Sequence, residues 1–320
     1  MTVQRPLDGK KTALDALDPC QVCASLSTQP LYPATYTGSA EEAATYFLAH
    51  RTASTHGSIV CCGNCGFVFT SPRFSDSEYD RIYREIQAPV DLDPVFEAAN
   101  DARFKRLSAI VRRFHPRETA FVDFGCGDGS FLREFNSPHG RGFEIGTEGR
   151  RTVGPYEIVT GDWAKVAGSP LFPPNAFDFV VAFDVLEHLP RIGEDLALIR
   201  TVLKPGGHLF VSVPNSESFV AKAMGKHWSL LLLEHLWYFS PKTLERMLIS
   251  YGFTRLAIRS LPYDAPIAHL ATRVAQTFGM KGTFRVGRIS RRVLPIPVGL
   301  MLGVFCKAPQ PPPVRSRYWL

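Results

Sequence analysis

The spacing of apolar residues changes at about residue 119. From there to about residue 307, short apolar runs alternate with segments whose apolar residues recur every three to four positions. The runs predict strands near 119–124, 140–145, 156–160, 177–183, 207–213, 256–260 and 300–306, with helices near 130–135, 192–203 and 241–251. Strands and helices in regular succession are typical of a parallel sheet covered on both faces. The sequence therefore predicts an α/β fold with a doubly wound, mostly parallel seven-stranded sheet.

The segment before residue 119 has a different pattern. Ser75 is a good N-cap for a short helix near 76–86, and apolar residues at helical spacing predict a longer helix near 94–114. Cysteines mark the part further upstream. We therefore expect a tail over 1–19, a cysteine-bearing module over 20–74, a helical connection over 75–118, the α/β domain over 119–307 with a basic insertion at about 265–297, and a tail over 308–320.

Charge is distributed unevenly. The net charge is +6, yet no acidic residue follows Asp264, while nine lysines and arginines do, which leaves 27 basic against 30 acidic residues in the rest, a net charge of −3. A basic end on a nearly neutral body favours a local anionic partner, such as a phosphate-bearing small molecule, over general nucleic-acid binding. A solvated basic face without a partner and a peripheral contact with an anionic membrane surface remain alternatives.

Five of the seven cysteines lie in the first 65 residues. Two CxxC pairs, Cys20 with Cys23 and Cys62 with Cys65, supply four thiolates, which is the preferred ligand set of a closed, structural zinc site. An iron–sulfur site and unligated thiols are alternatives, and Cys61 could replace Cys62. The first residues have no apolar leader segment and no uncharged stretch is long enough to span a membrane, so we expect a cytoplasmic protein without disulfides.

A glycine-rich turn follows the first predicted strand of the α/β domain. Gly125, Gly127 and Gly129 let the backbone approach a ligand closely, and Asp123 just before them suits a cationic group better than a pyrophosphate. A carboxylate at Glu144, at the end of the next strand, can accept two ribose hydroxyls. After the third strand, Asp162 stands beside Trp163, an aromatic ring that could lie against a purine.

These motifs, continued by the segments FDFVVAFDVLEHLP and LKPGGHLFVSVPN, resemble those of the class I S-adenosylmethionine-dependent methyltransferases. The resemblance covers about residues 100–265. The CxxC segments and EHLWYFSPKTLERMLISYGF are similar to a bacterial subgroup with an N-terminal zinc-binding segment, which includes sugar C-methyltransferases and enzymes of surface-glycan or natural-product biosynthesis. The implied fold is Rossmann-like, and the implied cofactors are S-adenosylmethionine and a structural zinc ion.

The resemblance also assigns roles to individual residues. Asp123 would lie near the amino group of the cofactor, Glu144 would bind its ribose, Asp162 its adenine amine with Trp163 alongside, and Asp184 would lie near its methionine end. The loop formed by Gly125, Cys126, Gly127 and Gly129 would line the methionine portion.

The sulfonium of S-adenosylmethionine is already electrophilic, so the enzyme mainly has to position a nucleophile and, where needed, remove its proton. His188 and His235 are the candidates for that step, with Tyr238 assisting, because histidine titrates near neutral pH and both follow segments that end at the carboxyl edge of the sheet. The expected acceptor is a small molecule, such as a sugar, a nucleotide-sugar or a precursor of a glycan or natural product. A nucleic-acid methyltransferase and a zinc-bearing interaction protein with a non-catalytic core are the alternatives.

Overall fold

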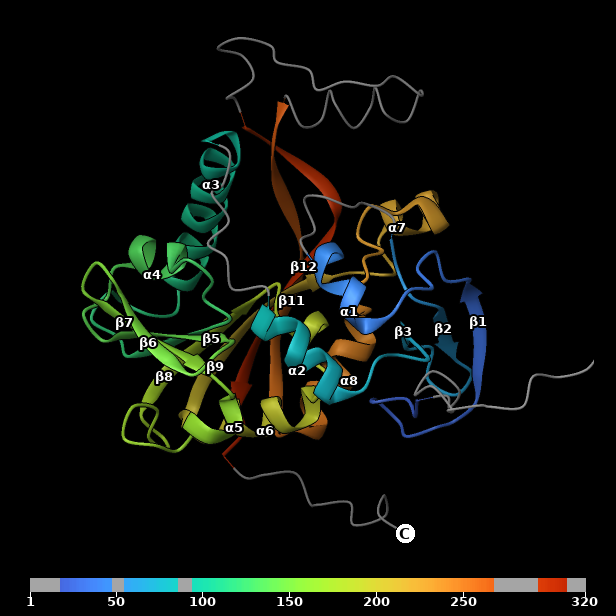
Figure 1. Ribbon diagram of the computed structural model, residues 1–320. Helices are drawn as coiled ribbons and strands as arrows, with labels where there is room; N and C mark the ends of the chain where they lie inside the picture. The colour runs from blue at the N-terminus through green and yellow to red at the C-terminus, as the bar shows by residue number, and fades with distance from the viewer. Residues whose placement is uncertain (1–17, 48–54, 86–93, 268–292, 310–320) are drawn as a thin grey trace, which may run out of the picture.

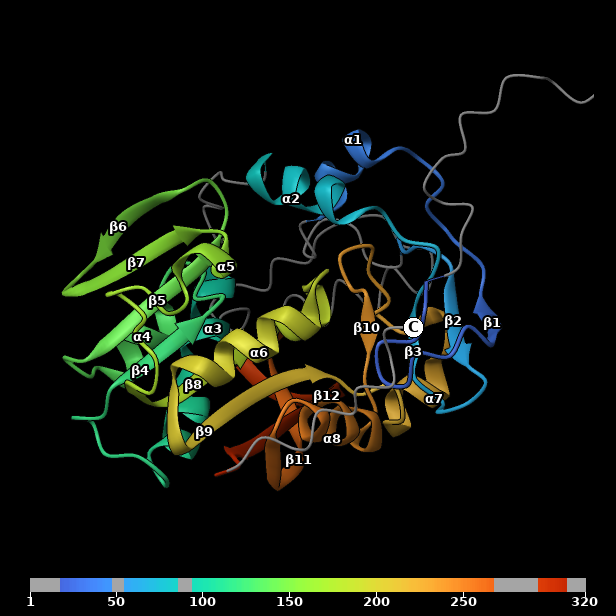
Figure 2. The same cartoon turned by 90° about the horizontal axis from the view of Figure 1, so that it is seen from below.

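The computed structural model describes residues 18–47, 55–85, 94–267 and 293–309. Within them the chain forms two sheets, one with eight strands and one with four. Figure 1 shows the small sheet on the side of the molecule opposite to strands β6 and β7 of the large one, and Figure 2 shows the same arrangement from below.

The large sheet confirms the predicted doubly wound, mostly parallel architecture. In the order in which they pair, its strands are β11 (Phe253–Pro266), β12 (Val293–Lys307), β9 (Leu203–Pro214), β8 (Phe177–Phe183), β4 (Phe121–Phe124), β5 (Gly140–Ile145), β7 (Tyr156–Gly161) and β6 (Gly149–Val153). Strands β9, β8, β4, β5 and β7 run parallel, whereas β6, β11 and β12 pair antiparallel with their neighbours. The carboxyl ends of the five parallel strands therefore meet at one edge.

The prediction of seven strands is one short. The additional strand β6 forms a hairpin with β7, in which Val153 pairs with Tyr156. Four of its five residues are exposed, so it lacks the apolar run by which the other strands were identified. The last two strands are also longer than expected. Because Pro266 pairs with Val293, residues at both ends of the predicted basic insertion belong to the sheet, and the part at 268–292 lies outside the described residues.

Helices cover both faces of the large sheet because alternate residues of each strand point to opposite sides. On one face, α3 (Pro94–Val111) and α4 (Ser130–Phe135) pack on Phe179 and Val181 of β8. On the other, α6 (Ile192–Val202) and α8 (Pro241–Ser250) pack in a core that contains Val180 and Ala182. Each fully buried side chain of this size contributes about 1.5–3 kcal/mol, so the sheet is a rigid support for the loops at its edge.

The small sheet joins distant parts of the chain. Its strands, in pairing order, are β1 (Thr28–Tyr32), β2 (Ile59–Cys62), β3 (Val68–Thr70) and β10 (Trp237–Tyr238). Trp237 pairs with Phe69, and the Trp237 ring lies 6.3 Å from the ring of Phe69. The sheet of the N-terminal module is therefore completed by a strand that the sequence places between β9 and α8.

Shorter elements connect these parts. The module carries α1 (Ala40–Ala43) and the 3-10 turn η2 (Ala44–Tyr46), and α2 (Asp76–Glu85) leads from it. Further along the chain lie α5 (Trp163–Val166), the 3-10 turn η3 (Leu186–His188), α7 (Phe219–Met224) and the 3-10 turn η4 (Gly225–His227). Among the described residues, no helix is both long and apolar enough to cross a membrane.

One of the nine basic residues after Asp264 has a structural role. Lys307 is buried, and its Nζ donates to the carbonyl oxygen of Leu203 at 2.5 Å and to the Asn175 side chain at 2.8 Å. Burial lowers the pKa of this amine. Lys307 therefore holds the end of β12 against β9 and does not contribute to a basic surface. The other eight lie outside the described residues.

Candidate functional site

The glycine-rich turn lies where β4 ends and α4 begins. Gly125 has a φ of +76° and Gly127 a φ of +50°, a left-handed conformation that favours glycine, and a Cβ at Gly125 would also run into Val185. The backbone N–H groups of Gly125 and Cys126 donate to the carbonyl of Phe143 at 2.8 and 3.0 Å. These bonds attach the loop to the end of β5 and leave Gly127 exposed at the edge.

Asp123 lies in β4 directly below this loop. The residue is 4% exposed, and its Oδ2 has no hydrogen-bond partner within the described residues. Burial, followed by the nearby carboxylates of Glu144 and Asp128, raises the pKa of Asp123 well above its usual range. Burying a carboxyl oxygen without a hydrogen-bond partner raises the free energy of the folded protein, unless a bound ligand supplies that partner.

Glu144 lies at the end of β5, beside the loop. Its Oε2 accepts a hydrogen bond from the Gly127 amide at 2.6 Å, and its Oε1 accepts one from the Ile145 amide at 3.1 Å. Burial raises the pKa of Glu144, and these two hydrogen bonds oppose that rise. Arg151 of β6 donates to the carbonyl of Gly127. The loop, the acid and β6 are thus hydrogen-bonded into one unit.

Two residues predicted to contact a cofactor have buried side chains. Cys126 is 7% exposed and belongs to the core beneath the loop, so only its backbone faces the edge. Trp163 is 2% exposed, and its ring packs 4.7 Å from Phe143 and 5.1 Å from both Phe124 and Phe172. Trp163 is therefore mainly a core residue that also borders the pocket described next.

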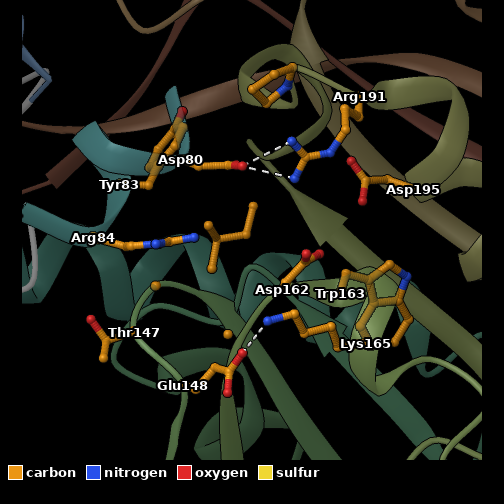
Figure 3. Close-up of a pocket in the computed structure, with 14 residues that line it drawn as sticks. Asp80, Tyr83, Arg84, Thr147, Glu148, Asp162, Trp163, Lys165, Arg191 and Asp195 are labelled. Carbon is orange, nitrogen blue, oxygen red and sulfur yellow. Dashed lines mark hydrogen bonds and ion pairs between the residues drawn. The ribbon is translucent and has the colours of Figure 1, made fainter. Parts of the chain in front are cut away.

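A pocket of about 310 Å³ opens at the carboxyl ends of β5 and β7 (Figure 3). Asp162 and Trp163 line it, together with the residues that follow Glu144. Asp162 caps α5, since its Oδ1 accepts from the amide of Ala164 at 3.0 Å. The two residues expected at the adenine end thus line the pocket, whereas Glu144, expected at the ribose, and the glycine loop are not part of its lining.

The sequence did not predict the residues of the opposite wall of the pocket. Asp80 and Arg84 come from α2, and Arg191 and Asp195 from the start of α6. Arg191 binds Asp80 through two hydrogen bonds of 3.1 Å each, as Figure 3 shows. Burial raises the pKa of Asp195 to about 7. Because α2 precedes the sheet by many residues, the rule that ligands bind at strand ends could not identify it.

Asp184, at the end of β8, is held by two neighbours. Its Oδ1 accepts from the Ser212 hydroxyl at 2.6 Å, and its Oδ2 forms an ion pair of 2.5 Å with Arg103 of α3. The residue has a φ of +56°, an uncommon conformation for a side chain other than glycine. Asp184 is therefore a rigid charged group at the sheet edge, and Arg103 is a partner that no sequence motif indicated.

His188 and His235 lie together beyond Asp184. Their ring centroids are 4.7 Å apart, and the Nδ1 of each lies near a backbone carbonyl, that of Glu234 at 2.9 Å for His188 and that of Leu230 at 2.8 Å for His235. Since a carbonyl only accepts, both Nδ1 atoms carry the proton and both Nε2 atoms carry a lone pair. Burial lowers the pKa of His188 to about 4 and that of His235 well below its usual range.

Tyr238 is close to this pair, but its hydroxyl is engaged. The residue is 1% exposed, and its hydroxyl donates to the carbonyl of Leu232 at 3.3 Å. Burial raises its pKa. Its ring centroid lies 6.2 Å from that of His235. This geometry favours a positioning role for Tyr238 over a direct proton transfer.

The N-terminal module is attached to the segment that carries His235. The Thr70 hydroxyl donates to the carbonyl of His235 at 3.0 Å, and the Thr70 amide donates to that of Leu236 at 2.9 Å. In turn, the Leu236 amide donates to the carbonyl of Glu187 at 2.7 Å. The position of His235 thus depends on strand β3 as well as on the large sheet.

The four cysteines of the CxxC pairs converge within this module. Their sulfur atoms lie within 4.8 Å of one another, with 3.5 Å between Cys20 and Cys65 and 3.6 Å between Cys23 and Cys62. Sulfurs around a tetrahedral zinc ion, at about 2.3 Å from it, would be about 3.8 Å apart, so the geometry fits such an ion. Cys61 is not part of the cluster, and its Sγ lies near the carbonyl of Cys62 at 3.9 Å.

The chain is similar in sequence to known methyltransferases. The sequence model of a family described as "Methyltransferase domain" matches residues 99–258, which is half of the chain. The ubiquinone biosynthesis O-methyltransferase of Burkholderia pseudomallei is 27% identical over 193 residues, 56% of this chain and 82% of that protein. The protein of the same name from Cupriavidus pinatubonensis is 24% identical over 210 residues, 61% of this chain and 84% of that protein.

Solved structures with a similar fold include a methyltransferase of Burkholderia thailandensis that acts on 1,6-didemethyltoxoflavin, solved with that compound and S-adenosylhomocysteine. It has a TM-score of 0.47 and 15% identity, and the match covers 77% of this chain and 97% of that one. For a methyltransferase of Thermotoga maritima the TM-score is 0.43 at 17% identity, covering 65% and 91%. The family match, which spans the parallel sheet and its glycine loop, means that the chain belongs to the class I S-adenosylmethionine-dependent methyltransferases.

Proposed function

We propose that this enzyme transfers the methyl group of S-adenosylmethionine to a hydroxyl oxygen of a small molecule, and that the acceptor is a sugar, a nucleotide-linked sugar or a glycan precursor. The cofactor would occupy the carboxyl edge of the large sheet, from the glycine loop to the pocket beside α5.

The unpaired oxygen of Asp123 carries the assignment of the cofactor site. It lies below the backbone of Gly125 and Gly127, where a carboxylate would repel a pyrophosphate and attract the ammonium group of the methionine moiety. A cation at this point would return the pKa of Asp123 towards its usual range, because an opposite charge favours the ionised form. The backbone of Cys126 and Gly129 would complete the methionine side of the site.

The remaining contacts follow the strand order. Glu144 already accepts one amide at each oxygen, and each oxygen retains a lone pair for a ribose hydroxyl. Asp162 would bind the adenine amine, with the edge of Trp163 beside the base, in the pocket closed by Arg191 and Asp80. Asp184 would lie near the methionine end, next to the methyl group.

The acceptor side is supported by the two histidines. During transfer the acceptor oxygen attacks the methyl carbon, the carbon–sulfur bond breaks with its electron pair going to sulfur, and the hydroxyl proton leaves. The Nε2 lone pairs of His188 and His235 are the proposed acceptors of this proton. Holding the reactants in line can supply about 7–11 kcal/mol of the barrier. The similarity to relatives named O-methyltransferases supports oxygen as the methylated atom.

A sugar-type acceptor is the finer part of the proposal. The resemblance of the CxxC segments to glycan and sugar methyltransferases supports it, as does the excess of arginine after Asp264, because guanidinium groups match phosphate oxygens. The four cysteines would hold a structural zinc ion, with no open position for substrate, and the module would act by fixing the segment that carries His235.

Calorimetric titration of the purified chain with S-adenosylmethionine and, separately, with NADH tests the cofactor. We expect only S-adenosylmethionine to bind, and Asp123→Asn to weaken it without changing the zinc content. Transfer from methyl-labelled S-adenosylmethionine to a panel of nucleotide-linked sugars and simple phenols then tests the acceptor. Labelling of phenols alone would overturn the sugar assignment, and binding of NADH alone would overturn the cofactor site.

A further inference from the structure

A second cluster of metal-ligating side chains lies at the carboxyl edge of the large sheet. Glu187, His188 and His235 each offer one ligand atom, and these atoms all lie within 4.8 Å of one another. Glu187 and His188 belong to η3, directly after β8, whereas His235 belongs to the segment before β10. The cluster is thus assembled from two parts of the chain by the fold.

The buried acid of the cluster has an oxygen without a partner. Glu187 is 1% exposed, and its Oε2 makes no hydrogen bond within the described residues. The negative charges of Asp184 and Glu234 disfavour the ionised form of the Glu187 carboxyl group. Arg103, a cation that acts on it favourably, already forms its ion pair with Asp184. A buried carboxylate among other acids is strongly destabilised unless a cation is bound beside it.

The two histidines are oriented as metal ligands usually are. Each donates its Nδ1 proton to a backbone carbonyl, which fixes the ring and leaves Nε2 as the donor atom. The carbonyl groups belong to Glu234 and Leu230, so the orientation comes from the backbone and needs no further side chain. By contrast, Nε2 of His115 lies 2.9 Å from Nδ1 of His208, so these two ring nitrogens are hydrogen-bonded to each other and are not available to a metal ion.

We propose that Glu187, His188 and His235 bind one divalent first-row transition-metal ion, such as Mn²⁺ or Fe²⁺, which holds the acceptor hydroxyl. Two imidazoles and one carboxylate on one side of an ion suit these metals and leave open positions for water or substrate. This deepens the proposed function and rests on it for its role in transfer, but binding of the ion does not depend on it.

The chemistry follows from the open positions. A hydroxyl group bound to the ion has a lowered pKa, loses its proton to solvent and attacks the methyl carbon as an alkoxide. The carbon–sulfur electron pair goes to sulfur, giving S-adenosylhomocysteine and the methyl ether. With the ion bound, the histidines act as ligands, which replaces the role of proton acceptor given to them in the proposed function, and they remain deprotonated at Nε2 throughout the reaction.

Titration of the zinc-loaded full-length protein with Mn²⁺, followed by the electron paramagnetic resonance signal of the free ion, tests the site directly. We expect one bound Mn²⁺ per chain in the wild type, and at least 10-fold weaker binding in Glu187→Gln and His235→Gln. His227→Gln is the matched control, because His227 is exposed on η4 and outside the cluster, and it should bind as the wild type does. Retained zinc and S-adenosylmethionine binding would show that the variants are folded.

Four outcomes separate this inference from the proposed function. Failure of the wild type to bind stoichiometric Mn²⁺, or equal affinity in Glu187→Gln, would overturn the metal site. Full methyl transfer by wild-type enzyme in the presence of a chelator would overturn the role of the ion while leaving the proposed function intact. Mn²⁺ binding with no transfer to any hydroxyl acceptor would support the site and contradict the proposed function.

Discussion

The two ligand clusters of this molecule differ in the number of ligands and in what positions them. Four thiolates in the N-terminal module can complete a tetrahedral set, whereas the second cluster consists of Glu187, His188 and His235, which offer three ligand atoms. A closed set holds an ion away from reactants, and an incomplete set leaves room for one. The comparison assigns different proposed roles to the two clusters: the first would stabilise the module, and the second would take part in methyl transfer.

The two clusters are nevertheless connected. Strand β3 begins three residues after Cys65, pairs with β10 and ends at Thr70, whose hydroxyl binds the carbonyl of His235. A change at the closed cluster should therefore reach the open one through backbone hydrogen bonds.

The largest expected effect is on the closed cluster. Cys65→Ser removes one thiolate, and since structural zinc contributes about 10–16 kcal/mol in small zinc-binding domains, we expect loss of zinc and unfolding of the module. Metal analysis and limited proteolysis of the purified protein measure both. Cys61→Ser, outside the cluster, should keep the full zinc content. Unchanged zinc in Cys65→Ser would refute the closed site.

Glu144→Gln tests whether the cofactor binds beside the glycine loop. Hydrogen bonds to a charged group are worth about 1.5–3 kcal/mol, so the affinity for S-adenosylmethionine should fall about 10- to 150-fold with the zinc content unchanged. Calorimetry gives the dissociation constant. Glu157→Gln is the control, because Glu157 pairs with Arg141 and Arg150 on the same sheet without facing the loop. Equal affinity in wild type and Glu144→Gln would remove Glu144 from the site.

His115 and His208 form a second histidine pair, to which we assign a role in stability only. Burial, followed by the nearby His208, lowers the pKa of His115 to about 4. Because its pKa is higher in the unfolded chain, the unfolded state takes up more protons below about pH 6.5, and stability should fall by about 1–2 kcal/mol between pH 7 and pH 5. His115→Phe, which can still stack on Phe179, should lose this part of the pH dependence in urea unfolding. An identical pH dependence in both proteins would contradict the assignment.

The smallest effect on activity is expected from the hydrogen bond between Thr70 and His235, which connects the module to the open cluster. Thr70→Val keeps the shape of the side chain and removes its bond to the His235 carbonyl, which is worth about 1 kcal/mol, so kcat should fall about 5-fold. The affinity for S-adenosylmethionine should not change, and Thr70→Ser should restore kcat. An unchanged kcat in Thr70→Val would show that the module does not position His235.

The sequence was informative where ligands are close together along the chain. The CxxC pairs and the run from Asp123 to Gly129 place their groups by local turns, so the sequence predicts them as candidate ligands, the glycine run with the support of the motifs that follow it. Arg103, Asp80 and the pairing of His235 with Glu187 depend on how α3, α2 and β10 pack, and no local pattern encodes that packing. Strand β6 was not predicted for another reason: an exposed edge strand needs no run of apolar residues, which is the pattern that identified the other strands.

Anomalous diffraction from crystals grown with Mn²⁺ and S-adenosylhomocysteine, recorded at the zinc and manganese edges, tests the comparison most directly. Our account predicts a zinc peak among the sulfurs of Cys20, Cys23, Cys62 and Cys65 and a separate manganese peak between Glu187, His188 and His235, with the cofactor product at Glu144. A single metal peak at the cysteines, with no manganese at the second cluster, would contradict it.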